Sequence, residues 1–356
     1  MLFIAHDLHY SRRVADGMHG QSTAKQGTNA AAFEPHWLLR NRHLQTLLAM
    51  RSRNAVAPVT QHARIQAFDG DALDVYFDAD LQPGKGAPIV LVAHGMEGSH
   101  RSPSVKRLCA ETRSLGWHSV ALVHRSCGRR LNDGKRLYHS AETQDLASVV
   151  SFVVQRWPGR TLFVAGYSLS GSQLVHWLGN GRHTFPAELR AAATVSPPFD
   201  LTVSAPEIDR VLGGAYRRYF LRRLIPKALA KARQHPGSLD EAKIRAIRSL
   251  HDFDDAVTAV LHGFRDADDY YRNGSCAQFL PNVAHPLLMI ASEDDPFNPG
   301  RTIPREACAQ NPFVHALFTR HGGHCGFVGG NVTQPNYWAE QQVLQFFQGF
   351  APDAAK

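Results

Sequence analysis

Short apolar runs alternate with longer stretches of helical periodicity through most of the chain. The runs that predict strands cover residues 61–68, 72–77, 88–93, 119–124, 161–165, 191–196, 286–291 and 314–319, and several are apolar without interruption. Such runs are typical of parallel strands that are covered on both faces. Apolar spacings of three and four predict helices over residues 103–115, 139–156, 169–180 and 336–349. The alternation predicts an α/β protein with a mostly parallel, eight-stranded sheet and helices on both faces.

The alternation stops between residues 200 and 275, where the chain reads as helix and loop. Gly213-Gly214, Pro226 and Pro236-Gly237 interrupt this stretch. We expect residues 201–275 to form a helical cap, inserted over the carboxyl ends of the strands of a core made by residues 31–200 and 276–356. Residues 1–30 are polar and aperiodic, and we expect them to form a loose N-terminal extension.

Composition is that of an ordinary globular protein. With 356 residues, 44% hydrophobic and 20% charged, the chain is long enough for one extensive core and an insertion. No apolar stretch reaches the roughly 18 residues of a membrane-spanning helix. The apolar patch in MLFIAHDLHY is shorter than the roughly 7–15 residues of a secretory signal. The five cysteines form no C-x-x-C pair, so we expect no disulfide framework or zinc knuckle and a reducing, cytoplasmic location.

The net charge of +8 is concentrated in one segment. Residues 205–250 contain eleven basic residues and four acids. Such a segment usually forms a solvated helix face, and it can also attract an anionic lipid surface or an acidic substrate. Peripheral contact with a membrane surface is therefore a hypothesis for this segment, whereas no nucleic-acid recognition motif accompanies the charge. The basic residues are Arg210, Arg217, Arg218, Arg222, Arg223, Lys227, Lys231, Arg233, Lys243, Arg245 and Arg248.

A serine lies where a predicted strand turns into a helix. The strand over residues 161–165 runs into Gly166-Tyr167-Ser168-Leu169-Ser170-Gly171, and a helical pattern follows. A serine on such a sharp turn projects its hydroxyl away from the sheet, beside the amides of the helix N-terminus. We predict Ser168 as the nucleophile because the strand end places the turn there. Ser170 replaces the second glycine of G-x-S-x-G and is the alternative.

A second glycine-containing loop follows the strand over residues 88–93. Its sequence is His94-Gly95-Met96-Glu97-Gly98, and a His-Gly pair at this point commonly lays a backbone amide beside the nucleophile. We expect an oxyanion hole made by the amides of Met96 and Leu169, and the Met96 side chain in the acyl pocket. One such donor contributes about 3–4 kcal/mol to transition-state stabilisation.

The candidate base and acid follow in the chain order Ser, Asp, His. His324 lies in a glycine-rich loop between the last strand and the last helix, and His321, nearer the strand, is the competitor that we expect to be structural. Asp294 and Asp295 follow the strand over residues 286–291. We favour Asp295, because the Asp-Pro-x-x-Pro turn fixes the backbone just past it; Asp294 is second and Asp200 third. The acid would hold the imidazole tautomer and stabilise the imidazolium.

The same acids and histidines suggest a metal site as an alternative. Asp294, Asp295, His321 and His324 are all metal-ligand types, but a metal site would leave the serine at the turn unexplained. The chain contains no G-x-G-x-x-G motif and no P-loop. We therefore expect neither a metal nor a cofactor.

Several of these segments resemble the YheT-like branch of the α/β-hydrolase superfamily. The resemblance covers roughly residues 33–350, and its specific motifs are Asn41-Arg42-His43-Leu44-Gln45-Thr46-Leu47 and Tyr138-His139-Ser140-Ala141-Glu142-Thr143-Gln144-Asp145. Pro35-His36-Trp37, His94-Gly95-Met96-Glu97-Gly98-Ser99, the turn at Ser168, Asp294-Asp295-Pro296-Phe297 and His321-Gly322-Gly323-His324 add to it. It implies the α/β-hydrolase fold, a triad of Ser168, Asp295 and His324, and activity on acyl esters, with acyl transfer to alcohols in some relatives.

Two segments depart from that family pattern. Ser170-Gly171 stands where the family has Gly-Gly, and Arg125-Ser126-Cys127-Gly128-Arg129 stands where it has Arg-Gly-Cys-Ser-Gly. The second change leaves the role of Cys127 open, and we expect a buried, inert thiol.

Three functions remain at this point. The leading hypothesis is hydrolysis of small-molecule or lipid acyl esters of short to medium chain length through an acyl-enzyme. The second is transfer of the same acyl group to an alcohol. The third is a binding protein with a hydrolase fold and no turnover, against which the intact serine, histidine and aspartate argue.

Overall fold

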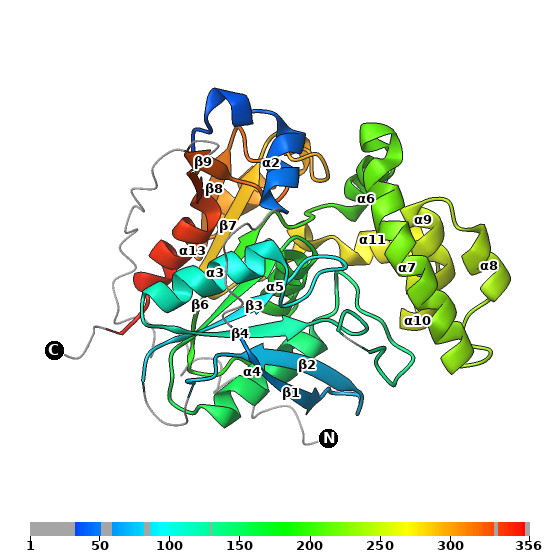
Figure 1. Ribbon diagram of the computed structural model, residues 1–356, viewed down its shortest axis with the longest axis horizontal. Helices are drawn as coiled ribbons and strands as arrows, with labels where there is room; N and C mark the ends of the chain where they lie inside the picture. Colours follow the sequence, from blue (N-terminus) through cyan, green and yellow to red (C-terminus); the bar gives the residue numbers. More distant parts are fainter. Residues whose placement is uncertain (1–32, 51–58, 82–85, 129, 331–333, 353–356) are drawn as a thin grey trace, which may run out of the picture. The chain divides into compact units, whose positions relative to one another are not determined.

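An eight-stranded sheet forms the centre of the protein (Figure 1). The computed structural model describes residues 33–50, 59–81, 86–128, 130–330 and 334–352, so the extension predicted over residues 1–30 lies outside the described residues. The strand order is β1-β2-β4-β3-β5-β6-β7-β8; β2 is antiparallel to β1 and to β4, and the other neighbours are parallel. The strands are β1 (Gln61–Gln66), β2 (Ala72–Phe77), β3 (Ile89–Ala93), β4 (His118–Val123), β5 (Leu162–Tyr167), β6 (Leu189–Val195), β7 (Leu287–Ser292) and β8 (Val314–Thr319).

Each predicted apolar run forms one of these strands, which confirms the predicted mostly parallel sheet. In β3, Ile89 and Leu91 face one apolar cluster and Val90 and Val92 face the other, so both sides of the strand are buried. This two-sided burial is the reason that the run is apolar throughout. The first strand is shorter than predicted, because a turn closed by the Gly70 amide on the Ala67 carbonyl follows it.

Helices cover both faces of the sheet. One face carries α3 (Pro103–Ser114) and α13 (Trp338–Gln348), and the other carries α4 (Gln144–Arg156), α5 (Leu169–Gly179) and α12 (Arg305–Gln310). The helix predicted over residues 139–156 begins only at Gln144. The residues before it are held in a turn, because the Ser140 amide donates to the Tyr270 hydroxyl (3.0 Å) and Glu142 accepts from the Gln144 amide (2.8 Å).

Helices occupy the stretch between β6 and β7. They are α6 (Leu201–Arg210), the short turn η2 (Val211–Gly214), α7 (Ala215–Gln234), α8 (Glu241–Ala246), α9 (Leu250–Phe253), the π-helical turn η3 (Asp254–Ala259), α10 (Val260–His262) and α11 (Ala267–Gly274). Apolar side chains of α7, α8, α9 and η3 share one cluster with Met96, Leu137 and Phe297, which come from loops of the sheet, whereas the buried apolar residues of α6 and α11 form a smaller cluster. This helical segment therefore packs against the edge of the sheet where β3 and β7 end (Figure 1).

The remaining elements are short. They are η1 (Trp37–Leu39), α2 (Arg42–Ala49), η4 (Cys276–Asn282), η5 (Gly300–Thr302) and a ribbon of β9 (Val328–Gly330) and β10 (Pro335–Tyr337). No helix in the described part of the chain is long and apolar enough to cross a membrane.

Candidate active site

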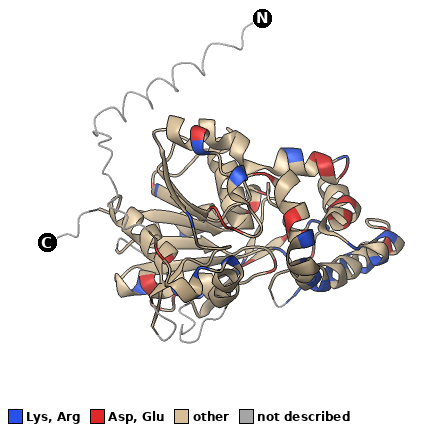
Figure 2. Cartoon of the chain, turned by 90° about the horizontal axis from the view of Figure 1, so that it is seen from above, with Lys and Arg blue, Asp and Glu red and all other residues tan. Residues whose placement is uncertain are grey.

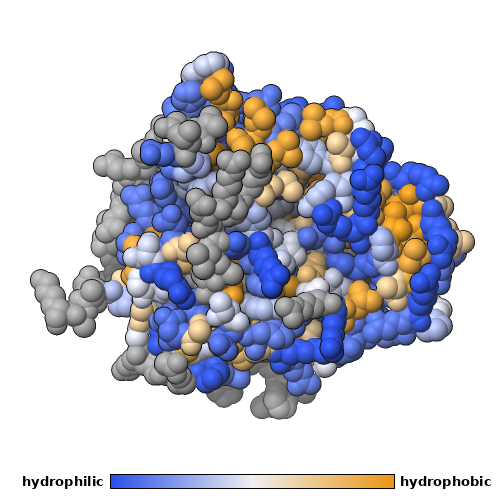
Figure 3. Space-filling view, in the orientation of Figure 1, coloured by the Kyte–Doolittle hydropathy of each residue, from blue (hydrophilic) through white to orange (hydrophobic). Residues whose placement is uncertain are grey.

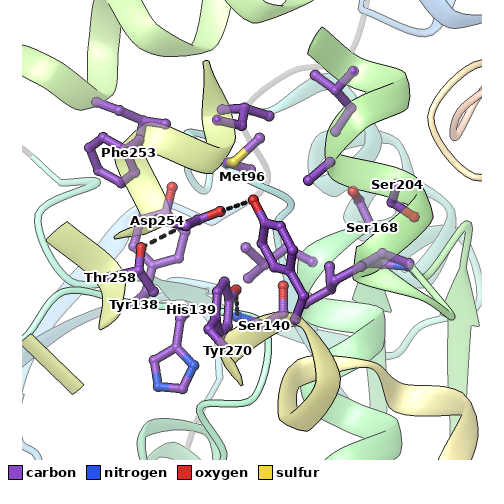
Figure 4. Close-up of a pocket in the computed structure, with 18 of the residues that line it drawn as sticks. Met96, Tyr138, His139, Ser140, Ser168, Ser204, Phe253, Asp254, Thr258 and Tyr270 are labelled. Carbon is purple, nitrogen blue, oxygen red and sulfur yellow. Dashed lines mark hydrogen bonds between the residues drawn. The ribbon is translucent and has the colours of Figure 1, made fainter. Parts of the chain in front are cut away.

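Ser168 lies on a sharp turn between β5 and α5. Its backbone angles, φ 52° and ψ −120°, are rare for a residue with a side chain, and such strain is typical of functional turns. Gly166 makes the turn possible, because a Cβ there would lie 2.5 Å from the Ser170 carbonyl oxygen. The turn directs the Ser168 hydroxyl away from the sheet and into a pocket (Figure 4).

Ser170, the alternative nucleophile, points elsewhere. Its hydroxyl lies 2.7 Å from Nε2 of His124 and donates to the His94 carbonyl (2.5 Å), and the residue is 1% exposed. The serine that replaces the second glycine is therefore held beneath the turn, and it is not part of the pocket lining.

The structure brings Ser168, His324 and Asp295 together in one line. Nε2 of His324 lies 2.8 Å from the Ser168 hydroxyl, and Nδ1 lies 2.9 Å from a carboxylate oxygen of Asp295. Asp295 is itself fixed, because it accepts hydrogen bonds from the amides of Phe297 (2.8 Å) and Asn298 (3.1 Å). Burial lowers the pKa of His324, but the Asp295 carboxylate and Cys325 together raise it above its ordinary value. The pair therefore favours a positive charge on the imidazole.

The competing acids and the competing histidine have other contacts. Asp294 accepts from the Gly323 amide (2.9 Å) and lies 3.3 Å from Nδ1 of His321. Asp200 is the N-cap of α6, where it accepts from the Thr202 amide (2.9 Å). The four residues considered as metal ligands thus form two separate histidine–aspartate pairs.

Helix α2 holds the loop that carries His324. The His324 amide donates to the Thr46 hydroxyl (2.9 Å). Gln45 accepts from the Val328 amide (2.7 Å) and donates to the Val328 carbonyl (3.0 Å), and it is fully buried. A Cβ on Gly323 would lie 2.4 Å from the Arg42 carbonyl oxygen, so the helix and the loop are in direct contact. From the sequence alone, Gln45 and Thr46 received no role. The family motif over residues 41–47, which contains both, was the signal that could have pointed to them.

The loop after β3 lies against the turn at Ser168. A Cβ on Gly95 would lie 3.1 Å from the Ser168 Cβ, and Met96 lines the same pocket as Ser168. Within the described part of the chain, the amides of Met96 and Leu169 donate no hydrogen bond. Both amides therefore remain available to a bound group.

A buried ionic contact fixes the residue after Met96. The Glu97 carboxylate accepts from Tyr138 (2.8 Å) and from Lys227 of α7 (2.5 Å), while its amide donates to the Tyr138 hydroxyl (2.8 Å). The Glu97 backbone has a positive φ of 57°, so these contacts stabilise an unusual conformation. They also link the helical segment to the loop that carries the Met96 amide.

Cys127 lies beside this contact. Its sulfur is 3.6 Å from the Lys227 nitrogen and 3.9 Å from the Glu97 carboxylate. Burial nevertheless raises the pKa of the Cys127 thiol to about 12. The thiol therefore stays protonated and has little nucleophilic character near neutral pH.

The pocket in front of Ser168 lies between the sheet loops and the helical segment (Figure 4). Most of its lining is apolar, with Leu201, Leu224, Phe253 and Phe297 among its walls. A polar group lies in the wall formed by η3 and α11. There, Asp254 accepts from Thr258 (2.6 Å) and Tyr271 (2.9 Å), and burial raises the pKa of Asp254 to about 6.

Next to the pocket, His139, Glu142 and His262 place potential metal-ligand atoms within 4.8 Å of one another. Arg136 already donates to Glu142 (2.6 Å). The Ala141 amide points at Nδ1 of His139 (3.3 Å), whereas a histidine that binds metal through Nε2 carries a proton on Nδ1. These contacts do not fit a bound metal ion.

The fold and the line of serine, histidine and carboxylate are those of the α/β-hydrolases. The family model described as "Serine aminopeptidase, S33" matches residues 84–307. YheT of Escherichia coli (strain K12) is 33% identical over 90% of this chain and 94% of its own length. The phospholipase ABHD3 of Mus musculus is 29% identical over 79% of this chain and 67% of its own. The Pyrococcus furiosus esterase Pf2001 superposes with a TM-score of 0.55 at 14% identity, over 85% of this chain and 96% of that one, which shows the shared fold.

The chain therefore belongs to the YheT-like branch of the α/β-hydrolases, a branch of esterase-like hydrolases.

Proposed function

We propose that this protein hydrolyses carboxylic esters through an acyl-enzyme formed on Ser168. The observation that carries the proposal is the line of hydrogen-bonding distances from the Ser168 hydroxyl through His324 to Asp295, at the wall of an apolar pocket. A base within hydrogen-bond reach of a serine, and itself oriented by a carboxylate, is the arrangement that activates a hydroxyl.

In the first half of the proposed reaction, His324 takes the Ser168 proton while the serine oxygen bonds to the acyl carbon. The carbonyl oxygen becomes negatively charged, and the amides of Met96 and Leu169 would donate to it. The bond to the alcohol oxygen then breaks, and His324 returns the proton to that oxygen. In the second half, His324 takes a proton from water, the hydroxide bonds to the acyl carbon, and the acid leaves as Ser168 regains its proton.

The pocket supports an acyl ester as the substrate class. A mainly apolar cavity with a few polar groups excludes water and favours a hydrocarbon chain. Its walls include Leu201 of α6, Leu224 of α7 and Phe253 of α9, so we propose that residues 201–275 act as a cap that selects the acyl group. The relatives named as esterase and phospholipase are consistent with this class. A cytoplasmic location stays a prediction that rests on the five free cysteines.

The test is turnover of p-nitrophenyl esters of graded chain length by the full chain and by Ser168→Ala. The proposal predicts turnover that the variant loses, with a chain-length optimum set by the pocket. The same assay with added ethanol reads acyl transfer from the ratio of ethyl ester to acid. Equal rates for wild type and variant, after subtraction of the buffer rate, would remove Ser168 from the mechanism.

A further inference from the structure

Helix α2 buries two polar side chains and leaves two leucines exposed, unlike an ordinary surface helix. Gln45 and Thr46 are buried, at 0% and 3% exposure, whereas Leu44 and Leu47 are 44% and 46% exposed. A helix that lies on a globular protein normally turns its leucines inward. Here the polar side chains face inward because they bind the loop that carries His324, as described above. The leucines are consequently left on the outside.

The exposed leucines are part of a larger apolar surface. Within the described residues, eight large hydrophobic side chains are prominently exposed, and five of them lie between residues 37 and 50. Trp37 is 69% exposed, and Leu38 and Met50 are each 47% exposed. Figure 3 shows a group of apolar side chains at the upper edge of the molecule, in the region of η1 and α2. Such a concentration usually marks a surface that contacts another phase or molecule.

Most of the charges on this surface are positive. Residues 36–50 contain Arg40 and Arg42 and no acid, and the neighbouring Glu34 pairs with Arg40 at 4.0 Å. The N-terminal end of α7 adjoins α2, since Nδ1 of His43 lies 3.3 Å from the Tyr216 hydroxyl.

Helix α7 contains seven Lys and Arg and no acid, and Figure 2 shows them along its length. In the described part of the chain, its exposed Arg218, Arg222 and Arg223 form no salt bridge with a carboxylate. Their positive charge is therefore not neutralised by the protein.

We propose that the surface formed by η1 and α2, assisted by the arginines of α7, docks the protein on anionic lipid bilayers. An exposed tryptophan, leucines on one helix face and uncompensated arginines are the combination that inserts shallowly into a lipid interface and attracts anionic headgroups. Exposure of this apolar area to water is unfavourable in free energy. Insertion into the acyl-chain boundary of a bilayer removes the area from water and is therefore favourable. The docked helix is the one that holds the His324 loop, so this loop would lie close to the lipid.

Docking would bring the protein to its ester substrate, and this role rests on the proposed ester hydrolysis. Docking itself can be measured without turnover. The experiment is flotation of the full chain with vesicles of equal parts phosphatidylcholine and phosphatidylglycerol, and with vesicles of phosphatidylcholine alone. The variants are Leu44→Gln/Leu47→Gln and, as a matched control, Val260→Gln, since Val260 is 55% exposed but lies on α10.

We expect wild type and Val260→Gln to float with the mixed vesicles, less so as salt is raised. The double variant should bind at least about tenfold more weakly, because two leucine side chains no longer enter the lipid. All three proteins should hydrolyse a short, water-soluble p-nitrophenyl ester equally. Normal vesicle binding without any turnover would contradict the proposed function and leave docking standing.

Three results would overturn the docking proposal. One is an absence of vesicle binding by wild type, and another is equal binding by the double variant. The third comes from light scattering: a wild-type dimer that the double variant reduces to a monomer would show that a second copy of the chain covers this surface.

Discussion

The main-chain amide of His324 donates a hydrogen bond of 2.9 Å to the hydroxyl of Thr46, which joins the last loop of the sheet to a helix near the start of the described chain. The same hydroxyl donates to the Arg42 carbonyl (2.8 Å), so the threonine is fixed within its own helix. The position of His324 relative to Ser168 therefore depends on α2 as well as on the sheet.

Removal of this hydroxyl should impair catalysis. In Thr46→Val the His324 amide loses its acceptor in a buried site, which typically costs about 1–3 kcal/mol. We expect a loss of roughly tenfold or more in kcat toward a soluble ester, because each 1.36 kcal/mol in the barrier is about tenfold in rate. Thr46→Ser keeps the hydroxyl and should restore most of the rate. Equal rates for Thr46→Val and wild type would show that the loop is held without this contact.

The two adjacent aspartates should differ sharply in their contribution to turnover. Asp295→Asn places an amide next to Nδ1 of His324 and favours the wrong imidazole tautomer, a change that costs about 10⁴ in kcat in a related arrangement. Asp294→Asn keeps an oxygen that can accept from the Gly323 amide, and we expect a loss below about tenfold. Steady-state kinetics of both variants on one ester show which of the two aspartates orients His324. A larger loss for Asp294→Asn would reverse the assignment.

The dependence of turnover on pH should report His324. In the proposed mechanism the neutral imidazole is the base. Burial lowers the pKa of His324, but Asp295 and Cys325 together raise it above the ordinary 6.5. Consequently kcat/KM should rise with pH as His324 loses its proton, with its half-maximal value above pH 6.5. A half-maximal value below pH 6.5 would mean that burial, which lowers this pKa, outweighs the carboxylate.

Asp254 should make the protein less stable as the pH rises. Burial raises the pKa of Asp254 from 3.8 to about 6, so the folded state binds more protons than the unfolded state between these values. Stability from this group is therefore present below pH 3.8 and lost as the pH rises through about 6. The asparagine in Asp254→Asn cannot ionise. We therefore expect this variant to have a higher free energy of unfolding than wild type above about pH 6.

Urea unfolding of wild type and Asp254→Asn, at pH values below and above that range, measures the effect. Asp268→Asn is the control, because the Asp268 side chain is 67% exposed. Parallel pH dependences for wild type and Asp254→Asn would show that Asp254 does not titrate in this range.

The sheet and the line from Ser168 through His324 to Asp295 follow from local patterns in the sequence. The apolar runs around Val90 and Val164 are buried on both faces, and this two-sided burial leaves a strong signal. The turn at Ser168 is signalled by the small residues that its geometry requires, since Gly166 has no room for a side chain. Asp295 and His324 follow strands whose ends meet at one edge of the sheet.

Features set by tertiary contacts could not be predicted in the same way. Helix α2 has leucines outside and glutamine inside, so its periodicity does not reveal which face is buried. Two basic residues of α7 also bind other parts of the protein instead of facing solvent alone. Lys227 pairs with Glu97, and the 1% exposed Lys231 donates to the carbonyls of Asn132 and Gly134. Only the folded chain brings these partners, distant in sequence, together.

The central claim is that Ser168 is the nucleophile, and covalent trapping tests it most directly. Wild type, Ser168→Ala and Ser170→Ala are each treated with a fluorophosphonate and examined by intact-protein and peptide mass spectrometry. Ser170 is the matched control, because it lies two residues further along the chain, in the first turn of α5, and contacts His124 and the His94 carbonyl. The account predicts one adduct on the peptide that contains Ser168 in wild type, none in Ser168→Ala, and labelling retained in Ser170→Ala. An adduct that persists in Ser168→Ala, or that disappears only in Ser170→Ala, would contradict it.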